Sequence, residues 1–282
     1  MTRAWLIVGC GYTGTELART LVAQGQAAGV VITRRDGEAA RALGAALGVR
    51  GEPLDLTDPA PGAAGAAPAP PGAIVVSTAP PGGDPAAEIR ALLALARGAA
   101  RLVYVSSTGV YGPGHGAWVD ETWPIAPITA SGRARAAAEA ALAGAAVPYV
   151  ALRAAGIYGP GRGLVERIRA GTYRVIGDGT SHVSRIHVVD LVAAIVAAAG
   201  SLATGAINVA DDDPAPIGEV ADAAAARLGM PPPPRVPAGA VSAEVAGMLT
   251  ADRRITNRRL RDELGVVLRY PSWRDGLEAE LR

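Results

Sequence analysis

The chain has 282 residues, half of them apolar, and its 27 basic and 26 acidic side chains give a formal net charge of +1. This length and apolar content allow one large hydrophobic core with a small appended lobe. The near-zero charge argues against nucleic acid or anionic lipid as a partner, and the single cysteine, Cys10, excludes an internal disulfide. No apolar run approaches the roughly 18 residues that a membrane span needs, so we expect a cytoplasmic protein.

Short apolar runs alternate with longer Ala- and Leu-rich stretches through the first half of the chain. The uninterrupted, β-branched runs predict strands covered on both faces, at Ala4–Val8, Val30–Thr33, Ile74–Thr78, Leu102–Ser106 and Tyr149–Arg153. The stretches between them predict helices at Thr13–Gln24, Gly37–Leu47, Asp84–Arg97 and Gly132–Ala143. This alternation predicts an α/β fold with a doubly wound, mostly parallel sheet.

The predicted domains divide the chain after residue 155. Residues 1–155 would form the sheet core, and 156–282 a smaller C-terminal lobe on the substrate side, with 186–210 returning in part to the sheet. Two segments have a biased composition. Pro59–Gly72 predicts a surface loop, and Pro231–Pro234 predicts a polyproline spacer between the core and a C-terminal lobe.

The run Gly9–Gly14 has the spacing GxGxxG, follows the first predicted strand directly and opens the first predicted helix. In this context Gly9 allows a tight turn, Gly11 lets the backbone approach a pyrophosphate, and Gly14 permits close helix–strand packing. Tyr12 and Thr13 stand at the helix N-terminus, where free N–H groups attract phosphate. The run therefore predicts a Rossmann-type domain that binds a nicotinamide dinucleotide, with an ordinary glycine-rich turn as the alternative.

The residues after the second predicted strand bear on which dinucleotide is bound. Proteins that bind NAD usually have Asp or Glu at this position, which accepts hydrogen bonds from the ribose 2′-hydroxyl. This strand instead ends in Arg34 and Arg35, with no carboxylate before Asp36. Two guanidinium groups suit the 2′-phosphate of NADP, and a pair of solvated arginines, with NAD as cofactor, is the alternative. A further short strand, the third in chain order, is predicted to end at Asp55 in the run Leu54–Leu56. Asp55 either meets the adenine there or caps Thr57 and Asp58.

The chain resembles the extended short-chain dehydrogenase/reductase superfamily, which includes NAD-dependent epimerases and dehydratases. Four stretches carry this resemblance in order after the glycine turn, at 103–112 (VYVSSTGVYG), 152–161 (LRAAGIYGPG), 186–191 (IHVVDL) and 205–210 (GAINVA). In that family a Ser or Thr after the fifth strand binds the substrate hydroxyl, and Thr108 falls at this place. A Tyr general acid/base and a Lys four residues later follow.

The Tyr and Lys positions are replaced here by Ser131 and Arg135. A phenol near pKa 10 can be tuned towards neutrality by a neighbouring cation, whereas a serine hydroxyl cannot. Arg135 stays protonated, so it can hold ribose oxygens but cannot join a proton relay. The pattern is similar to the atypical branch of the superfamily, which keeps the dinucleotide turn without the Tyr–Lys pair.

Two other tyrosines are candidates for the missing acid. Tyr111 leaves the fifth predicted strand and Tyr158 follows the sixth, and both loops belong to the edge of the sheet where ligands bind in open α/β folds. Either phenol could supply a proton, although packing beside Gly112 or Gly159 is the simpler interpretation.

The histidines do not indicate a catalytic triad or a metal centre. His187 and Asp190 could be combined with a serine, but no nucleophile elbow is present, and Asp190 is expected to cap the helical run Leu191–Ala199. The three histidines lack the spacing of metal ligands, so we expect no metal site.

Two functions of different classes follow. The first is an NADP(H)-dependent oxidoreductase or epimerase-like enzyme that acts on a small polar metabolite, a sugar-like one included, with Thr108 on the substrate, Arg135 on the cofactor and Tyr111 or Tyr158 as acid. The second is an inactive NADP(H) sensor that regulates a partner, suggested by Ser131 and Arg135. Related proteins dimerise through the helix that matches 132–143, so a homodimer is compatible with the sequence.

Overall fold

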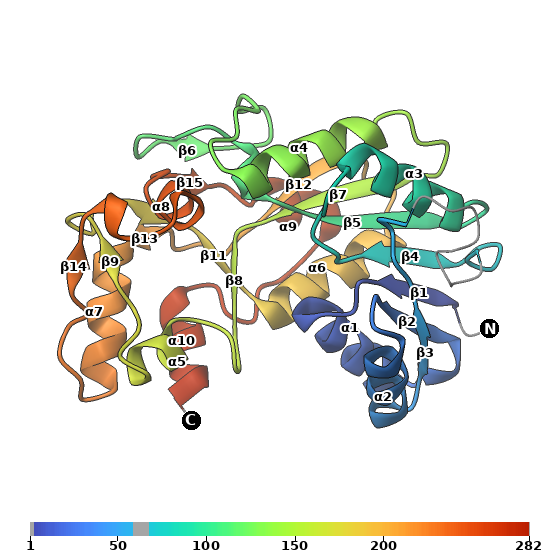
Figure 1. Ribbon diagram of the computed structural model, residues 1–282, viewed down its shortest axis with the longest axis horizontal. Helices are drawn as coiled ribbons and strands as arrows, with labels where there is room; N and C mark the ends of the chain where they lie inside the picture. Colours follow the sequence, from blue (N-terminus) through green and yellow to red (C-terminus); the bar gives the residue numbers. More distant parts are fainter. Residues whose placement is uncertain (1–2, 59–67, 282) are drawn as a thin grey trace. The chain divides into compact units, whose positions relative to one another are not determined.

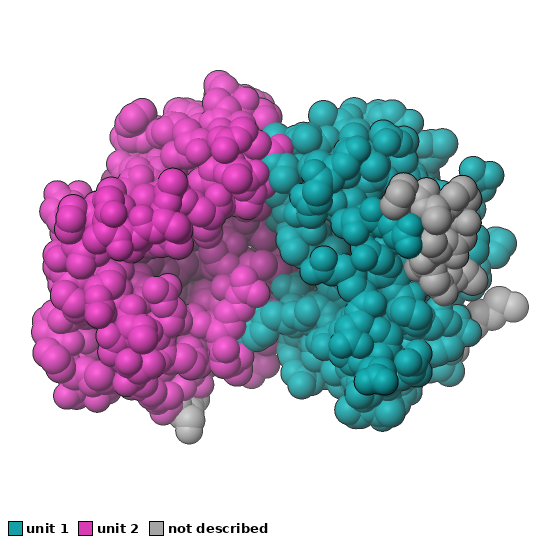
Figure 2. All heavy atoms as spheres, in the orientation of Figure 1, with its two compact units in different colours: residues 1–106, 134–152, 192–206 teal, residues 107–133, 153–191, 207–282 magenta. Residues whose placement is uncertain are grey.

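The computed structural model describes residues 3–58 and 68–281 and divides the chain into two compact units (Figures 1 and 2). Unit 1, teal in Figure 2, comprises Met1–Ser106, Ala134–Leu152 and Val192–Ala206. Unit 2, magenta, comprises Ser107–Arg133, Arg153–Leu191 and Ile207–Arg282. The sequence-based prediction divides the chain once, after residue 155. The two units are instead defined by contacts in space, and each contains three separate segments of the chain. Residues 59–67 of the expected Pro59–Gly72 loop lie outside the described residues.

A seven-stranded sheet has the strand order β12-β7-β5-β4-β1-β2-β3. The register sets Trp5 beside Val30 on one neighbouring strand and beside Ile74 on the other, with all strands from β3 to β5 parallel. This order, which reverses direction at β1, is that of a doubly wound Rossmann sheet, as the sequence predicts. The strands are β1 (Trp5–Val8), β2 (Val30–Arg34), β3 (Arg50–Pro53), β4 (Ile74–Ser77), β5 (Arg101–Ser107), β7 (Tyr149–Ala154) and β12 (Gly205–Val209).

Helices cover both faces of the strands in unit 1. Leu6 and Val8 of β1 belong to the same buried cluster as Leu92 and Ala138, on the helices that follow β4 and precede β7. Ile7 points the other way, because its Cγ2 lies 3.2 Å from where a Cβ on Gly14 would stand. Successive residues of a strand face opposite sides of the sheet, so both faces of β1 are buried. These helices are α1 (Tyr12–Ala23), α2 (Gly37–Leu47), α3 (Pro85–Leu95), α4 (Ala130–Leu142) and α6 (Val188–Gly200), with the 3-10 turn η1 (Ala27–Gly29).

Unit 2 consists of short strand pairs and helices. Parallel pairs are formed by β8 with β11, β9 with β14 and β6 with β15, and β10 pairs with β13 in antiparallel fashion. The strands are β6 (Trp118–Val119), β8 (Gly156–Tyr158), β9 (Val175–Ile176), β10 (His182–Val183), β11 (Arg185–His187), β13 (Ala215–Pro216), β14 (Arg235–Val236) and β15 (Arg254–Ile255). The helices are α5 (Leu164–Arg169), α7 (Ile217–Arg227), α8 (Ala243–Leu249), α9 (Arg258–Leu264) and α10 (Trp273–Leu281), with η2 (Thr108–Val110) and η3 (Ala238–Ala240).

Two sequence-based expectations need correction. The polyproline segment Pro231–Pro234 lies inside unit 2, between α7 and β14, and does not separate the sheet core from a further lobe. Asp190 is not the cap of α6, because that helix begins at Val188. Its carboxylate instead accepts hydrogen bonds from the backbone N–H groups of Arg269 (2.7 Å) and Tyr270 (2.9 Å), so it fixes a distant segment of unit 2. Within 3–58 and 68–281, no helix combines the length and the hydrophobicity that crossing a bilayer requires.

Candidate functional site

The glycine turn between β1 and α1 is held in a shape that only its glycines permit. Gly9 has φ +75°, and a Cβ there would stand 2.5 Å from Cβ of Ala79. A Cβ on Gly14 would stand 3.0 Å from Oγ1 of Thr78, so α1 packs tightly on the end of β4. A larger residue at the first position would be strained in the backbone and would clash, and at the second it would have little room.

The third glycine of the turn, Gly11, has a different environment. A Cβ there would meet one atom within 4 Å, the Gly9 carbonyl oxygen at 3.9 Å. Gly11 is the N-cap of α1 and supplies no side-chain cap, and the first turn, which begins with Tyr12 and Thr13, contains no acidic residue. A helix start with no carboxylate and with space in front of it fits the pyrophosphate of a dinucleotide.

Two threonines that the sequence analysis missed support the turn. Oγ1 of Thr78 donates to the Gly9 carbonyl at 2.7 Å, and Oγ1 of Thr33 accepts from the Gly9 N–H at 3.3 Å. The Thr33 carbonyl accepts from the Cys10 N–H at 2.7 Å, and the Cys10 thiol is fully buried, so burial raises its pKa. A hydroxyl residue at the end of each strand beside β1 is the sequence signal that could have found them.

Arg34 is attached to the turn itself. Its Nε donates to the Cys10 carbonyl at 2.7 Å, which leaves the far nitrogens of the guanidinium for a ligand, and Arg35 beside it is exposed. The next residue, Asp36, caps α2 by accepting from the N–H groups of Glu38 (2.9 Å) and Ala39 (3.1 Å). This carboxylate is engaged by the helix. At the position where NAD-binding proteins usually have an acidic residue for the ribose hydroxyl, this chain therefore presents the arginines Arg34 and Arg35.

Asp55 forms the second of its two predicted contacts, the one with the turn at Thr57. Its Oδ1 accepts from the N–H and the hydroxyl of Thr57 at 2.9 and 2.7 Å, and these bonds, the hydroxyl first, lower the pKa of the exposed carboxyl. Asp55 stands two residues beyond the end of β3 rather than at its last residue. The side chain therefore closes a turn.

Ser131 and Arg135, at the positions of the missing Tyr and Lys, lie on α4 and are both hydrogen-bonded. The Ser131 hydroxyl donates to Glu244 of α8, whose carboxylate also accepts from the Ala130 N–H at 3.0 Å. Hydrogen bonds from Ser131 lower the pKa of Glu244. In unit 1, Nη1 of Arg135 donates to the Val105 carbonyl and to the Tyr104 hydroxyl, the latter at 3.2 Å. Glu244 caps α4 from far along the chain, and the sequence gives no sign of it.

The segment after β5 contains the predicted substrate-binding hydroxyl. Thr108 opens η2 and is buried, with 8% of its surface exposed. Its neighbour Ser107 accepts the Gly109 N–H at 3.0 Å and keeps a hydroxyl proton to donate, so it is a second candidate hydroxyl that the sequence analysis missed.

Tyr111 is a fully buried phenol, and its hydroxyl donates to Oδ1 of Asn208 at 2.7 Å and accepts from Nη1 of Arg153 at 2.8 Å. The guanidinium of Arg153 also lies 4.9 Å from the centre of the Tyr111 ring. Bonds of this kind fix a side chain in a core, which agrees with the packing interpretation of Tyr111.

In the part of the chain that the structure describes, His187 has no carboxylate partner of the triad type, and Asp190 binds the backbone at 269 and 270. The imidazole packs against Tyr158 at 5.2 Å and Tyr270 at 4.0 Å, and Nδ1 accepts the Val189 N–H. Burial, with the charge of Arg269 as a smaller cause, lowers the pKa of His187 to about 4, so this side chain is neutral at physiological pH. The rejection of a Ser–His–Asp triad agrees with this geometry.

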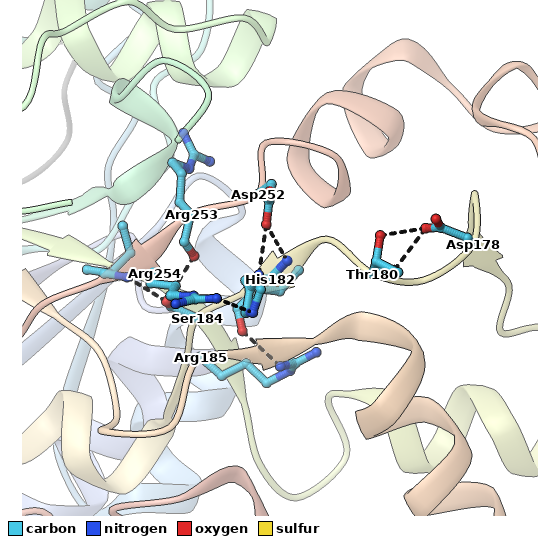
Figure 3. A network of polar contacts seen from close by, with 10 residues as sticks. Asp178, Thr180, His182, Ser184, Arg185, Asp252, Arg253 and Arg254 are labelled. Carbon is cyan, nitrogen blue, oxygen red and sulfur yellow. Dashed lines mark hydrogen bonds and ion pairs between the residues drawn. The ribbon is translucent and has the colours of Figure 1, made fainter. Parts of the chain in front are cut away.

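A second polar network lies around His182 in unit 2 (Figure 3). Nδ1 of His182 contacts Oδ1 of Asp252 at 2.9 Å, and the same oxygen accepts the His182 N–H at 2.8 Å. Nε2 faces Nη2 of Arg254 at 3.0 Å. The network joins β10 to the turn before β15. Among residues 3–58 and 68–281, no group of three His, Cys, Asp or Glu side chains is arranged to hold a metal ion.

The sheet order and the glycine turn together define a Rossmann-type NAD(P)-binding protein of the extended short-chain dehydrogenase/reductase superfamily. A sequence model described as the NAD dependent epimerase/dehydratase family matches residues 5–210. The chain belongs to this family.

Individual relatives extend the comparison. A functionally unknown conserved protein from Silicibacter pomeroyi is 35% identical, with a TM-score of 0.82 over 99% of this chain and 98% of the other. UDP-glucuronic acid 4-epimerase from Bacillus cereus, in complex with NAD, is 18% identical with a TM-score of 0.74 over 99% and 97% of the two chains, a likeness of fold alone.

A similarity of sequence also exists to a Streptomyces protein named 3-diazoavenalumate denitrifying reductase. The two are 41% identical over 123 residues, which are 42% of this chain and 40% of the relative. The match therefore spans less than half of the relative's length.

Proposed function

We propose that this protein is an NADP(H)-dependent oxidoreductase that acts on a small metabolite. The observation that carries the proposal is the position of Arg34, attached by its Nε to the Cys10 carbonyl of the glycine turn, beside an Asp36 that is engaged as a helix cap. The similarity to a protein named as a reductase supports the reaction type.

Different residues of unit 1 would bind different parts of the cofactor. The N–H groups at the start of α1 would hold the diphosphate, with Gly11 leaving room for it, and Arg34 and Arg35 would hold the 2′-phosphate. When bound, a nicotinamide supplies hydride transfer. Thr33 and Thr78 keep the turn in shape through their bonds to Gly9.

The proton of such a reaction cannot come from the usual residues. Ser131 is bonded to Glu244, a carboxylate whose pKa is lowered, and Arg135 remains a cation that donates to the Val105 carbonyl. We therefore expect turnover only with substrates whose reduction draws its proton from water or from another side chain.

The cofactor test is a titration of the purified protein with NADPH and with NADH. Arg34→Ala should weaken NADPH binding about 10- to 100-fold, since hydrogen bonds between charged groups contribute roughly 1.5–3 kcal/mol, and it should change NADH binding little. Arg97→Ala, which removes an exposed arginine after α3, is the matched control. Equal losses for both cofactors would contradict the assignment of Arg34, and tighter binding of NADH by the unaltered protein would contradict NADP.

A regulatory NADP(H)-binding protein is the second candidate, favoured by the engagement of Ser131 and Arg135 in structural bonds. It predicts tight NADPH binding without oxidation by any carbonyl compound, and a partner whose association depends on the cofactor. The double variant Ser131→Tyr, Arg135→Lys separates the candidates: a large gain of turnover shows a substrate site that lacks only the proton relay, and no gain favours the sensor.

A further inference from the structure

Unit 2 contains a pocket of about 320 Å³ that the cofactor proposal does not use. It is lined by residues of β8 and the loop after it, α5, β10, β11, α7, α8 and α10. This volume is at the small end of the range for ligand pockets, about 300–1,000 Å³. It suits one ring with a short chain better than an extended ligand.

The pocket wall consists of carbon surface and guanidinium groups. Aliphatic side chains from α5, α7 and α10 and the rings of Tyr158, Tyr173 and Trp273 form most of it. Among the described residues that line it there is no Ser, Thr, Asn, Gln, Asp, His or Lys. A sugar needs polar partners for several hydroxyl groups, because a buried polar group without a hydrogen bond is costly. This wall offers few such partners.

The charge in the pocket favours an anion. Arg162, Arg167 and Arg185 line it, against one carboxyl group, Glu280. Burial, followed by repulsion from Glu166, raises the pKa of Glu280 to about 7, so its negative charge is only partly present at neutral pH.

Arg185 is the least exposed of the three arginines. Its Nη1 donates to the Val183 carbonyl at 3.0 Å (Figure 3), and it has no ion pair within residues 3–58 and 68–281. Burial raises the pKa of the neighbouring Asp211 to about 8, and the charge of Arg185 opposes that rise. Burial lowers the pKa of Arg185, with the nearby Asp211 and Asp213 opposing that shift only in part, and an anionic ligand in the pocket would stabilise the charged guanidinium.

Two hydrogen-bond donors in the pocket wall also lack acceptors. The Tyr158 hydroxyl and Nε1 of Trp273 are buried without a hydrogen-bond partner in the described part of the chain. The phenol approaches α10 at Gly276, where an added Cβ would lie 2.0 Å from its oxygen. Buried polar groups of this kind are rare in native proteins, and each asks for an explanation such as a ligand. An empty cavity, by contrast, is expected to be purely apolar.

We propose that this pocket binds a small aromatic carboxylate, with the ring against Trp273 and Tyr173 and the carboxylate near Arg185 and the donors of Tyr158 and Trp273. The proposal concerns unit 2 alone. It goes beyond the proposed cofactor site and does not depend on it.

Equilibrium binding in the absence of cofactor tests the proposal. The probes are trans-cinnamate, its neutral analogue cinnamyl alcohol, and UDP-glucose, followed by calorimetry and by quenching of tryptophan fluorescence, with Trp273→Phe to assign the signal. We expect a Kd for cinnamate below about 1 mM, binding of the alcohol at least about tenfold weaker, and no binding of UDP-glucose at the same concentrations.

Tyr158→Phe separates a ligand role from a structural one. Loss of an unpartnered buried hydroxyl should leave the thermal midpoint of the free protein unchanged or higher, while cinnamate binding falls about three- to tenfold. Tyr270→Phe, in the same unit but outside the pocket wall, is the control. Arg167→Ala should weaken cinnamate binding where Arg169→Ala, on the same helix but outside the wall, does not.

Three results would overturn the proposal: no cinnamate binding at about 10 mM, about ten times the expected Kd; tighter binding of UDP-glucose than of cinnamate; or equal affinity of Tyr158→Phe and the unaltered protein. NADPH titration of the same samples is a separate measurement, so failure of this pocket and failure of the cofactor site can be distinguished.

Discussion

The N-termini of α1 and α4 are satisfied in opposite ways. At α1, Gly11 provides no side-chain cap, the first turn has no acidic residue, and the missing Cβ faces open space. At α4, the Glu244 carboxylate accepts from the Ala130 N–H and from the Ser131 hydroxyl. An unoccupied set of helix amides is an anion site, whereas a capped one is part of the scaffold. The glycine turn of the family is retained, whereas Ser131 and Arg135, at the positions of the family's Tyr and Lys, form hydrogen bonds to Glu244 and to the Val105 carbonyl.

The largest expected effect comes from closing the start of α1. Gly11→Asp places a carboxylate where the diphosphate would bind, and we expect NADPH affinity to fall at least about 100-fold, because a charged group is both displaced and repelled. The free energy of unfolding should change by only a few tenths of a kcal/mol, since Asp is a good N-cap and Gly an adequate one. Titration and chemical denaturation measure the two effects.

Gly11→Asn is the control for that variant, since it has the same shape without the charge. It should bind NADPH more tightly than Gly11→Asp. Unaltered NADPH affinity in Gly11→Asp would show that the open helix start is not the phosphate site.

Opening the start of α4 should have a smaller effect, on stability alone. Glu244→Ala removes the cap that accepts from Ala130 and Ser131, and we expect a loss of about 0.5–2 kcal/mol in the free energy of unfolding, the usual cost of losing an N-cap. Ser131→Ala should cost less, because the Ala130 bond remains. NADPH affinity should not change, and a loss of cofactor binding in Glu244→Ala would contradict a purely structural role.

The same cap predicts a pH dependence. Hydrogen bonds from Ser131 lower the pKa of Glu244 in the folded protein, so the unfolded chain binds a proton first as the pH falls. The stabilisation is complete above the ordinary glutamate pKa near 4.3 and is lost as the pH falls through the lowered value. Denaturation at a series of pH values should show a shallower acid decline for Glu244→Gln, and identical declines would contradict this.

The smallest effect concerns Asp36. Asp36→Asn keeps a side-chain oxygen that can cap α2, and it removes a negative charge next to Arg34 and Arg35. We expect stability within about 0.5 kcal/mol of the original and NADPH binding about two- to fivefold tighter, in the range of exposed charge interactions. NADH binding serves as the internal control. Weaker NADPH binding would show that the 2′-phosphate lies elsewhere.

Patterns in neighbouring residues were enough for unit 1. Uninterrupted β-branched runs gave strands that are buried on both faces, and the spacing of Gly9, Gly11 and Gly14 gave the turn, because these features act within one or two elements. The role predicted for Asp190 was wrong because its partner lies far along the chain. Asp is a common helix cap, and nothing near it shows that the backbone at 269 and 270 is its partner.

The sequence by itself determined the Rossmann fold, the dinucleotide turn and the absence of the Tyr–Lys pair, because each of these depends only on residue type and local spacing. Only the tertiary structure decided that Glu244 caps α4, that Arg34 is attached to the Cys10 carbonyl, and that Tyr158 and Trp273 share a pocket with Arg185. These contacts join residues far apart in the chain, and such pairings depend on how whole elements pack rather than on the pattern of any one segment.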